Sequence, residues 1–316
     1  MAPIRIGIVG IGKIARDQHL PVIADDPGFT LAAVATRSGA HVDVPTFPTL
    51  EAMLDGAELD AVALCTPPQV RHKLALTALR RGKHVLLEKP PGATLGEVEQ
   101  LAALADEVRR TLFATWHSRF APAVEPARRW LADKAIRSVH IAWKEDVRRW
   151  HPGQTWIWEP GGLGVFDPGI NALSIATRIL PLPFFLTRSV LSFPENCRAP
   201  IAASLAFSDA DGMPITAEFD FRQQGGEIWD IEIATDAGRL TLSRGGAVMA
   251  VDGKVTSQEK SAEYAGLYAR FRELIERGTS EVDVSPFRHV ADAFMLGRIE
   301  RVAAFYDNPS TEKAYA

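Results

Sequence analysis

The sequence predicts an α/β protein with an N-terminal parallel-sheet domain and a second α/β domain built on a large, mostly antiparallel open sheet. Over the first 120 residues, short apolar runs rich in β-branched residues alternate with longer amphipathic segments, which is typical of parallel strands joined by helices. After about residue 120 this rhythm changes, and segments of alternating polarity follow from 186 to 258. We therefore predict domains over 1–120 and 121–316.

The expected elements follow from these patterns in chain order. The apolar runs predict strands over IRIGIV at 4–9, LAAVAT at 31–36, DAVALC at 60–65, HVLLE at 84–88 and TLFATW at 111–116. Helical spacing of apolar residues predicts helices over 69–82, from 95 to about 109, 122–132, 261–277 and 286–304. One strand is expected near 137–147, and the last helix could pack back on the first domain.

Composition and charge exclude several classes of protein. A net charge of -4 supplies no basic surface for nucleic acid, and no apolar run reaches the ~20 residues that span a bilayer. The N-terminus runs directly into a strand pattern without the plan of a signal peptide, so a cytoplasmic protein is expected. Two cysteines, Cys65 and Cys197, are too few for a disulfide framework or a metal cluster, and we expect no metal.

A glycine-rich turn follows the first strand. Gly10-Ile11-Gly12-Lys13-Ile14-Ala15 has the G-x-G-x-x-A spacing of the dinucleotide fingerprint, in which glycines let the backbone approach a pyrophosphate at a helix N-terminus. This pattern is weak alone, but here it follows a strand and opens a helix, as a Rossmann domain requires. We predict that Gly10, Gly12, Lys13 and Ile14 bind NAD(P), with a merely structural turn as the alternative.

The end of the second strand bears on the choice of cofactor. An acidic residue at that point would bind the ribose 2′-hydroxyl of NAD, but the sequence there has Thr36, Arg37 and Ser38. A guanidinium and two hydroxyls suit a 2′-phosphate. We therefore expect NADP to be accepted along with NAD; a solvated Arg37 is the alternative.

Two proline-containing loops follow the fourth and fifth strands, at the sheet edge where open α/β folds bind ligands. CTPPQV places Thr66 and Pro67 there, and EKPPGA places Glu88 and Lys89 there, so all four are predicted to contact the cofactor. Lys89 stands between a strand end and two prolines, close to the expected nicotinamide, and is a candidate for acid–base chemistry. Contact with cofactor phosphate or solvent alone is the other reading.

A second glycine-rich turn, at 161–164, leads into an apolar helix that carries two polar side chains. Asp167 and Asn171 are four residues apart, so both would project from one helix face towards one ligand. Asp167 could equally cap a helix that Pro168 starts, which is a common structural role.

Several motifs together resemble one enzyme family: GIVGIGKIA, ALCTPP, GKHVLLEKP, SRFAP at 118–122 and GGLGVFDPGIN. This combination resembles the glucose-fructose oxidoreductase and inositol dehydrogenase family over essentially the whole chain. The resemblance implies that Lys89 assists catalysis and that Asp167 makes acid–base contacts. Two positions depart from the pattern: Asn171 stands where most members have a titratable histidine, and Arg71 stands where a histidine often follows T-P.

Asn171 and the tryptophan-rich segment 143–162 make the chain similar to the aldose 1-dehydrogenases of that family, the bacterial L-arabinose/D-galactose 1-dehydrogenases. Sugars present apolar faces and polar edges, so their sites combine aromatic rings with a few polar groups. Trp150 and Trp229 are candidate faces, and His117, Glu145 and Asn171 are candidate partners of hydroxyls.

The resemblance implies oxidation of the anomeric hydroxyl of an aldose, L-arabinose or D-galactose, to the aldonolactone, with hydride transfer to NAD(P)+. Lys89 and Asp167 would share the removal of the hydroxyl proton. It also implies a homodimer or homotetramer, with the small-molecule aldose as the partner and neither nucleic acid nor membrane. Two other functions stay open at this point: a non-catalytic sugar or cofactor sensor of the same fold, and an NAD-dependent glycosidase.

Overall fold

A computed structural model describes residues 2–37, 42–259 and 262–306 of the chain. It divides into two compact units, the first made of residues 1–117 and 262–284 and the second of residues 118–261 and 285–316. The first unit is built on a parallel sheet and the second on a mostly antiparallel one, so the predicted fold class is confirmed. Each unit is described by itself.

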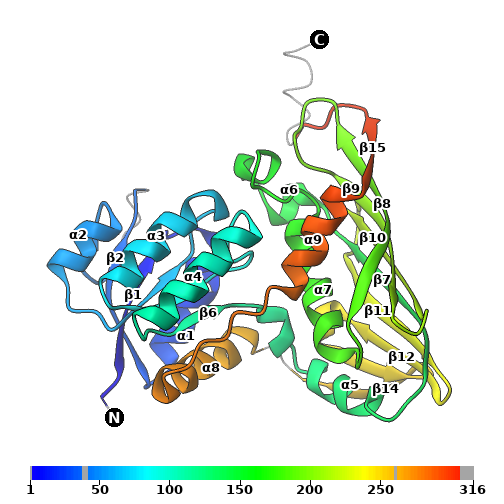
Figure 1. The fold of residues 1–316 in the computed structure, drawn as a ribbon, viewed down its shortest axis with the longest axis horizontal. Coiled ribbons are helices and arrows are strands. Elements are labelled where there is room, and N and C mark those ends of the chain that lie inside the picture. Colours follow the sequence, from blue (N-terminus) through cyan, green and yellow to red (C-terminus); the bar gives the residue numbers. More distant parts are fainter. Residues whose placement is uncertain (1, 38–41, 260–261, 307–316) are drawn as a thin grey trace. The chain divides into compact units, whose positions relative to one another are not determined.

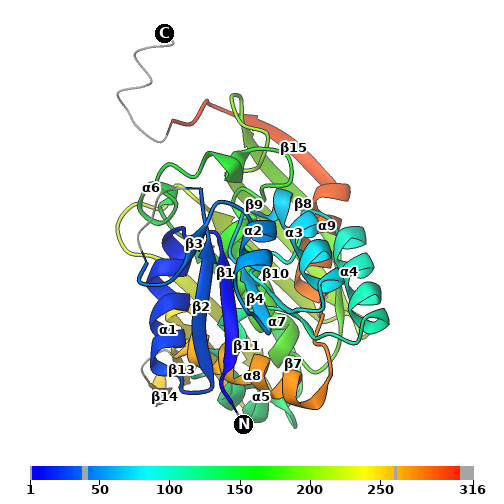
Figure 2. The ribbon, with the colours of Figure 1, turned by 90° about the vertical axis from the view of Figure 1, so that its left-hand side faces the viewer.

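The first unit contains a six-stranded parallel sheet in the order β3-β2-β1-β4-β5-β6. Figure 2 shows β2, β1 and β4 side by side, and the parallel register pairs Val9 with Leu64 at the end of β4. Each strand predicted in this domain overlaps one of these strands. Their bounds are β1 Ile4–Val9, β2 Phe29–Ala35, β3 Thr46–Phe47, β4 Ala61–Leu64, β5 His84–Leu87 and β6 Leu112–Ala114.

Helices cover both faces of this sheet (Figure 1). On one face, buried residues of α2, α3 and α4 join Val9, Val62 and Leu64 in one apolar cluster. On the other face α1 packs beside β2 and α8. Because side chains alternate along a strand, β1 supplies Val9 to the first face and Ile8 to the second. The helices are α1 Leu20–Asp25, preceded by a π-helical turn at Ala15–His19, α2 Leu50–Gly56, α3 Pro68–Arg80, α4 Leu95–Glu107 and α8 Glu263–Arg277.

Helix α8 belongs to the first unit although it comes late in the sequence. Tyr268 meets Phe29 of β2 edge to face, and Phe271 stacks between Phe29 and Phe113 of β6. These aromatic contacts fill the core beneath the sheet, and α8 ends at Gly278 in a left-handed conformation, φ 62°. The structure thus differs from the predicted division at 120: residues 262–284 join the first unit, and the helix that joins it is α8 rather than the last one.

The second unit contains a nine-stranded sheet in the order β14-β13-β12-β11-β7-β10-β9-β8-β15. All neighbours are antiparallel except two pairs, β7 with β10 and β8 with β15. The bounds are β7 Ile136–Lys144, β8 Phe184–Pro194, β9 Ala202–Asp209, β10 Pro214–Asp220, β11 Ile228–Thr235, β12 Gly238–Ser243, β13 Val248–Val251, β14 Lys254–Gln258 and β15 Gly297–Val302.

One face of this sheet is covered by helices α5, α7 and α9 (Figure 1). Buried residues alternate with half-buried ones along β9 and β11, as the sequence predicted for a sheet with one solvated face. The helices are α5 Val124–Leu131, the short α6 Val147–Trp150, α7 Phe166–Ile179 and α9 Ser285–Met295.

The predicted helix over 286–304 is wrong in its second half. Helix α9 ends at Met295, and residues Gly297–Val302 form β15 beside β8. At Gly297 an added Cβ would lie 2.7 Å from both the Ala293 carbonyl oxygen and Leu191, so only glycine lets the chain turn into the sheet this closely. Within the described residues, no helix is both long and apolar enough to cross a membrane.

Candidate active site

The glycine turn of the first unit begins where β1 ends. Gly10 has φ 91°, and a Cβ there would lie 3.0 Å from Thr66 Cγ2 and 3.2 Å from the Cys65 carbonyl. A side chain at this position would therefore be both strained and crowded against the end of β4. The turn leads directly into the π-helical turn at 15–19 and α1, so the predicted order of strand, glycine turn and helix is present.

Two features of this turn fit a nicotinamide dinucleotide. A Cβ at Gly12 would meet no protein atom within 4 Å, which leaves room for a pyrophosphate against the backbone. Across the turn, the buried Thr66 Oγ1 makes no hydrogen bond within the described part of the chain, so a bound ligand could satisfy it. Lys13 and Ile14 are exposed, and Lys13 pairs with Asp17 one turn later. Pro67 is exposed beside Thr66.

The predicted 2′-phosphate contacts are only partly described. Thr36 follows β2 half-buried and its amide donates to the Phe47 carbonyl, whereas Arg37 is exposed. Ser38 lies outside the described residues. The role of all three in cofactor choice stays a prediction.

Lys89 and Glu88 follow β5 at the carboxyl edge of the parallel sheet. Lys89 is half-buried, whereas Glu88 is buried with its carboxylate turned into the protein. Glu88 Oε1 accepts a 2.6 Å hydrogen bond from the Tyr264 hydroxyl and lies 3.0 Å from His19 Nε2. Contact of Glu88 with the cofactor stays a prediction. The sequence did not indicate that its carboxylate contacts Tyr264 and His19.

Burial opposes ionisation of Glu88, but the hydrogen bond and positive charge of His19 lower the pKa of Glu88 well below its usual range. Burial likewise disfavours charge on His19, whereas Cys65, Tyr268 and, to a smaller extent, Glu88 raise the pKa of His19 well above its ordinary value. The two residues therefore form a buried ion pair. The resemblance could not indicate this pair, because His19 and Glu88 lie 69 residues apart in the sequence and meet only in the folded unit.

His117 is the last residue of the first of the two segments that make up the first unit. Its Nδ1 lies 2.6 Å from Glu263 Oε2, and its ring stacks on Tyr264 at 5.4 Å between centroids. Its predicted contact with a sugar hydroxyl stays a prediction.

In the second unit, Glu145 lies in a buried polar cluster just after β7. Trp229 of β11 donates a 2.9 Å hydrogen bond from its indole Nε1 to Glu145 Oε2. The ring of Trp150, at the end of α6, lies 5.1 Å from that of Trp229 and donates to Glu227 Oε1 at 3.1 Å. The buried Trp143 stacks behind Trp229 at 6.0 Å. Three of the predicted sugar-site residues are thus brought together.

Asp167 joins this cluster through a residue that sequence reasoning passed over. His151 Nε2 lies 3.3 Å from Glu145 Oε1, and His151 Nδ1 lies 3.7 Å from Asp167 Oδ2. Both carboxylates are 3 % exposed, so the imidazole lies between two buried acids. His151 lies in the tryptophan-rich segment, but its distance in sequence from Glu145 and Asp167 does not indicate a contact. The contact with Asp167 forms only because α7 packs nearby.

Helix α7 positions Asp167 in its first turn. Val165 occupies the N-cap position, without a capping hydrogen bond from its side chain, and Asp167 lies inside the helix, so the alternative reading of Asp167 as the N-cap is wrong. Its amide donates to the Gly164 carbonyl at 2.9 Å. Asn171 lies half-buried one turn further along the same face.

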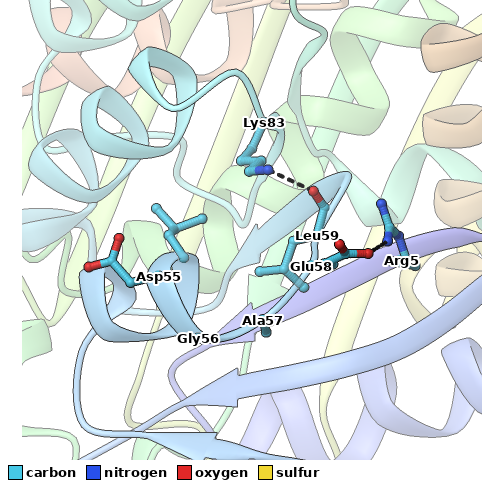
Figure 3. Close-up of a pocket in the computed structure, with 8 residues that line it drawn as sticks. Arg5, Asp55, Gly56, Ala57, Glu58, Leu59 and Lys83 are labelled. Atoms are coloured by element: carbon cyan, nitrogen blue, oxygen red, sulfur yellow. Dashed lines mark hydrogen bonds and ion pairs between the residues drawn. The ribbon is translucent and has the colours of Figure 1, made fainter.

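A separate cavity of about 450 Å³ lies at the opposite edge of the parallel sheet. It is lined by the start of β1, the end of α2, the loop before β4 and the residue before β5. Figure 3 shows that two of its charged side chains already have partners within the lining: Arg5 pairs with Glu58, and Lys83 Nζ donates to the Leu59 carbonyl at 2.8 Å. Ligands of open α/β sheets bind at the carboxyl ends of the strands, so this cavity is not the candidate site.

Comparison with known proteins gives the family. A model described as an oxidoreductase family with an NAD-binding Rossmann fold matches residues 4–115. Galactose 1-dehydrogenase of Pseudomonas fluorescens is 49 % identical over 97 % of this chain and 100 % of that protein. The chain belongs to the glucose-fructose oxidoreductase and inositol dehydrogenase family. The predicted family is thus confirmed, and with it a sugar oxidoreductase that has an NAD-binding Rossmann domain.

Two solved structures share the fold of this chain, and the first of them also agrees with the family assignment. The crystal structure of D-galactose-1-dehydrogenase from Rhizobium etli is 59 % identical, covers 97 % of this chain and 99 % of its own, and has a TM-score of 0.93. A point mutant of KijD10, a 3-ketoreductase from Actinomadura kijaniata crystallised with TDP-benzene and NADP, is 20 % identical with a TM-score of 0.83 over 95 % of this chain and 99 % of its own. The second likeness shows the fold alone.

Proposed function

We propose that the protein oxidises the anomeric C1 hydroxyl of D-galactose or L-arabinose to the aldonolactone and transfers the hydride to NAD(P)+. The observation that carries the proposal is the cluster of the second unit, in which two tryptophan rings meet two buried carboxylates and an imidazole. An apolar wall with a few convergent polar groups is the usual form of a small-molecule site. The likeness to two galactose 1-dehydrogenases supports the same substrate class.

The roles of the sugar-site residues follow from their chemistry. Trp229 and Trp150 would cover the C–H face of the ring, and Glu145 would accept hydrogen bonds from its hydroxyls. His151 fixes the Glu145 carboxylate at one oxygen while Trp229 fixes it at the other. Asn171 and His117 would bind further hydroxyls. L-Arabinose lacks the C6 hydroxymethyl of D-galactose and otherwise matches its ring, so both sugars would be accepted.

Oxidation at C1 needs a group that takes the hydroxyl proton. Lys89 would contact the reacting oxygen, and Asp167 would orient it or share its proton, so the two need not have a single identifiable base. A bound nicotinamide supplies the hydride acceptor. Gly10 and Gly12 would hold the pyrophosphate of the dinucleotide, and the Thr66 hydroxyl would donate a hydrogen bond to it. Arg37 would favour NADP, with NAD also used.

A panel of aldoses tests the proposal, with reduction of NAD+ and NADP+ followed by absorbance. We expect turnover of D-galactose and L-arabinose and much slower turnover of D-glucose, because a site that binds a hydroxyl strongly rejects an analogue whose hydroxyl is misplaced. D-Glucose differs from D-galactose only in the configuration at C4, so equal turnover of D-glucose would show that the site does not bind the C4 hydroxyl selectively. Cofactor and sugar binding without turnover would indicate a sensor, and cleavage of an aryl galactoside without oxidation of free sugar would indicate a glycosidase.

A further inference from the structure

Two buried charged side chains hold the backbone on either side of Lys89. Glu88 Oε2 accepts a 2.8 Å hydrogen bond from the Lys89 amide. From α3, the Arg71 guanidinium donates to the carbonyl oxygens of Glu88 and Pro90, the residues that flank Lys89. Glu88 and Arg71 are each 3 % exposed. Burying two ionisable side chains is costly, so their placement around a single residue calls for a reason other than stability.

The Glu88 carboxylate faces hydrogen-bond donors at both oxygens. Its Oε2 receives the Lys89 amide, and its Oε1 receives the Tyr264 hydroxyl and lies beside His19. A carboxylate accepts at both oxygens, whereas an amide accepts at only one and presents N–H groups at the other end. A glutamine at this position would therefore point its NH2 group at one of the N–H or O–H groups that now donate to Glu88.

The ion pair also connects Glu88 to the glycine turn. His19 ends the π-helical turn that follows Gly10–Ala15, and its Nδ1 lies 2.8 Å from the Tyr268 hydroxyl of α8. His19 is thus held on both ring nitrogens, by Tyr268 and by Glu88. Through this chain of contacts the position of the Lys89 amide is tied to the helix that begins at the cofactor turn.

Arg71 completes the arrangement from the other side. Besides the two carbonyls that flank Lys89, it donates to the carbonyl of Thr66, in the loop that follows β4. A planar guanidinium offers five donors in a fixed fork and can serve three carbonyls at once, whereas the compact ammonium of a lysine cannot span them. Arg71 therefore joins the loop after β4 to the loop after β5.

We propose that Glu88 and Arg71 are positioning residues for Lys89, which fix the backbone of its loop so that the amine is presented at one place to the C1 hydroxyl. The inference rests on the proposed function for the identity of the reaction. The loop geometry itself can be tested without any turnover. Misplacement of a reacting group by about 1 Å can cost about 10²-fold in rate, so the expected effect is on kcat.

The test compares E88Q and R71K with the full-length wild-type protein. We expect each variant to lower kcat with D-galactose by about 10- to 100-fold while KM for the sugar changes by less than about 3-fold. Hydrogen exchange of the backbone around Lys89 should become faster in both variants, because the Lys89 amide loses its acceptor or its loop loses its clamp.

Two controls separate positioning from loss of stability. F271L weakens the core of the same unit on α8 without touching the loop, and R81K alters an exposed arginine near the end of α3 that pairs with Asp55. Both controls should retain the wild-type kcat and the wild-type exchange around Lys89, although F271L should unfold at lower temperature. If E88Q does not fold, Y264F removes only one donor to Glu88 and should still lower kcat at constant KM.

The outcomes are distinct. The inference would be overturned if E88Q and R71K both kept the wild-type kcat and the wild-type exchange around Lys89, with Y264F in place of E88Q if E88Q does not fold. It would also be overturned if F271L lost as much kcat as these variants. A wild-type protein that oxidises no aldose would remove the proposed function, and faster exchange around Lys89 in the variants alone would then still support the positioning role.

Discussion

The Trp229 indole and the Glu145 carboxylate are joined by a 2.9 Å hydrogen bond between Nε1 and Oε2. Glu145 is buried and also faces His151 through its other oxygen, so its orientation is fixed from both sides before any ligand arrives. A carboxylate held this way can accept hydrogen bonds from sugar hydroxyls without first being reordered, which reduces the cost of binding.

Replacing Trp229 by Phe keeps an aromatic face but removes the donor to Glu145. Hydrogen bonds to a charged group are worth about 1.5–3 kcal/mol, so we expect KM for D-galactose to rise about 10-fold or more, with a smaller change in kcat. Steady-state kinetics measure this. Trp130 on α5, which lies under Lys134, provides the matched control, and W130F should behave as wild type. An unchanged KM in W229F would remove Trp229 from the sugar site.

Replacing Arg37 by Ala tests the choice of cofactor. Only NADP carries the 2′-phosphate, so we expect the Kd of NADP to rise by about 10-fold or more while that of NAD changes little. Titration of the two cofactors against the change in protein fluorescence gives both constants. R81A removes an exposed arginine elsewhere in the same unit and should affect neither. Equal losses for both cofactors would show that Arg37 does not bind the 2′-phosphate.

Much of the fold could be predicted because its signals are local. Strand, glycine turn and helix follow each other directly around Gly10, and alternating polarity marks the solvated sheet. What failed depends on tertiary contacts. The helical spacing of 286–304 was overridden after Met295, where β8 offers a free edge to Gly297–Val302. The placement of α8 was missed because its aromatic residues pack on β2 and β6.

Some residues of the candidate site were likewise predicted from the sequence, whereas others depend on tertiary contacts. Glu145, Trp150 and Trp229 were predicted from residue type and resemblance, and the second unit brings them together. His151 was not predicted, since the acids on either side of it come from the end of β7 and from α7. Arg71 was noted only as a departure from the family pattern, and its three carbonyl partners become visible only in the folded unit.

His84 should make the first unit sensitive to mild acid. Burial, assisted by the positive charge of Arg110, lowers the pKa of His84 from 6.5 to about 4, and the Thr111 amide donates to its Nδ1 at 3.0 Å. The unfolded chain then binds the proton more readily than the folded one, so this contribution to stability is present above pH 6.5 and is lost as the pH falls towards 4.

Urea unfolding at pH about 7 and about 5 measures the effect. We expect H84Q to lose less stability than wild type over this interval, because it has no proton to gain. His140, exposed on the large sheet and bonded to Thr216, supplies the control, and H140Q should show the wild-type loss. An H84Q variant with the full wild-type pH dependence would contradict the assignment.

Lys89 and Asp167 provide the sharpest test of the proposed reaction. K89M keeps the stem but removes the charge and the donors, and D167N keeps the shape but removes the titratable carboxylate. General-base assistance is worth about 10² to 10⁴ in rate, so each change should lower kcat by at least about 10²-fold. If the two act as a unit, the double variant should lose much less than the product of the single losses.

Cofactor binding should survive, because the turn from Gly10 to Ala15 is untouched. Since Val165 rather than Asp167 occupies the N-cap position of α7, a loss in D167N cannot be ascribed to a missing helix cap. A D167N variant with nearly normal kcat would remove Asp167 from the mechanism and leave Lys89 to act with another group of the site.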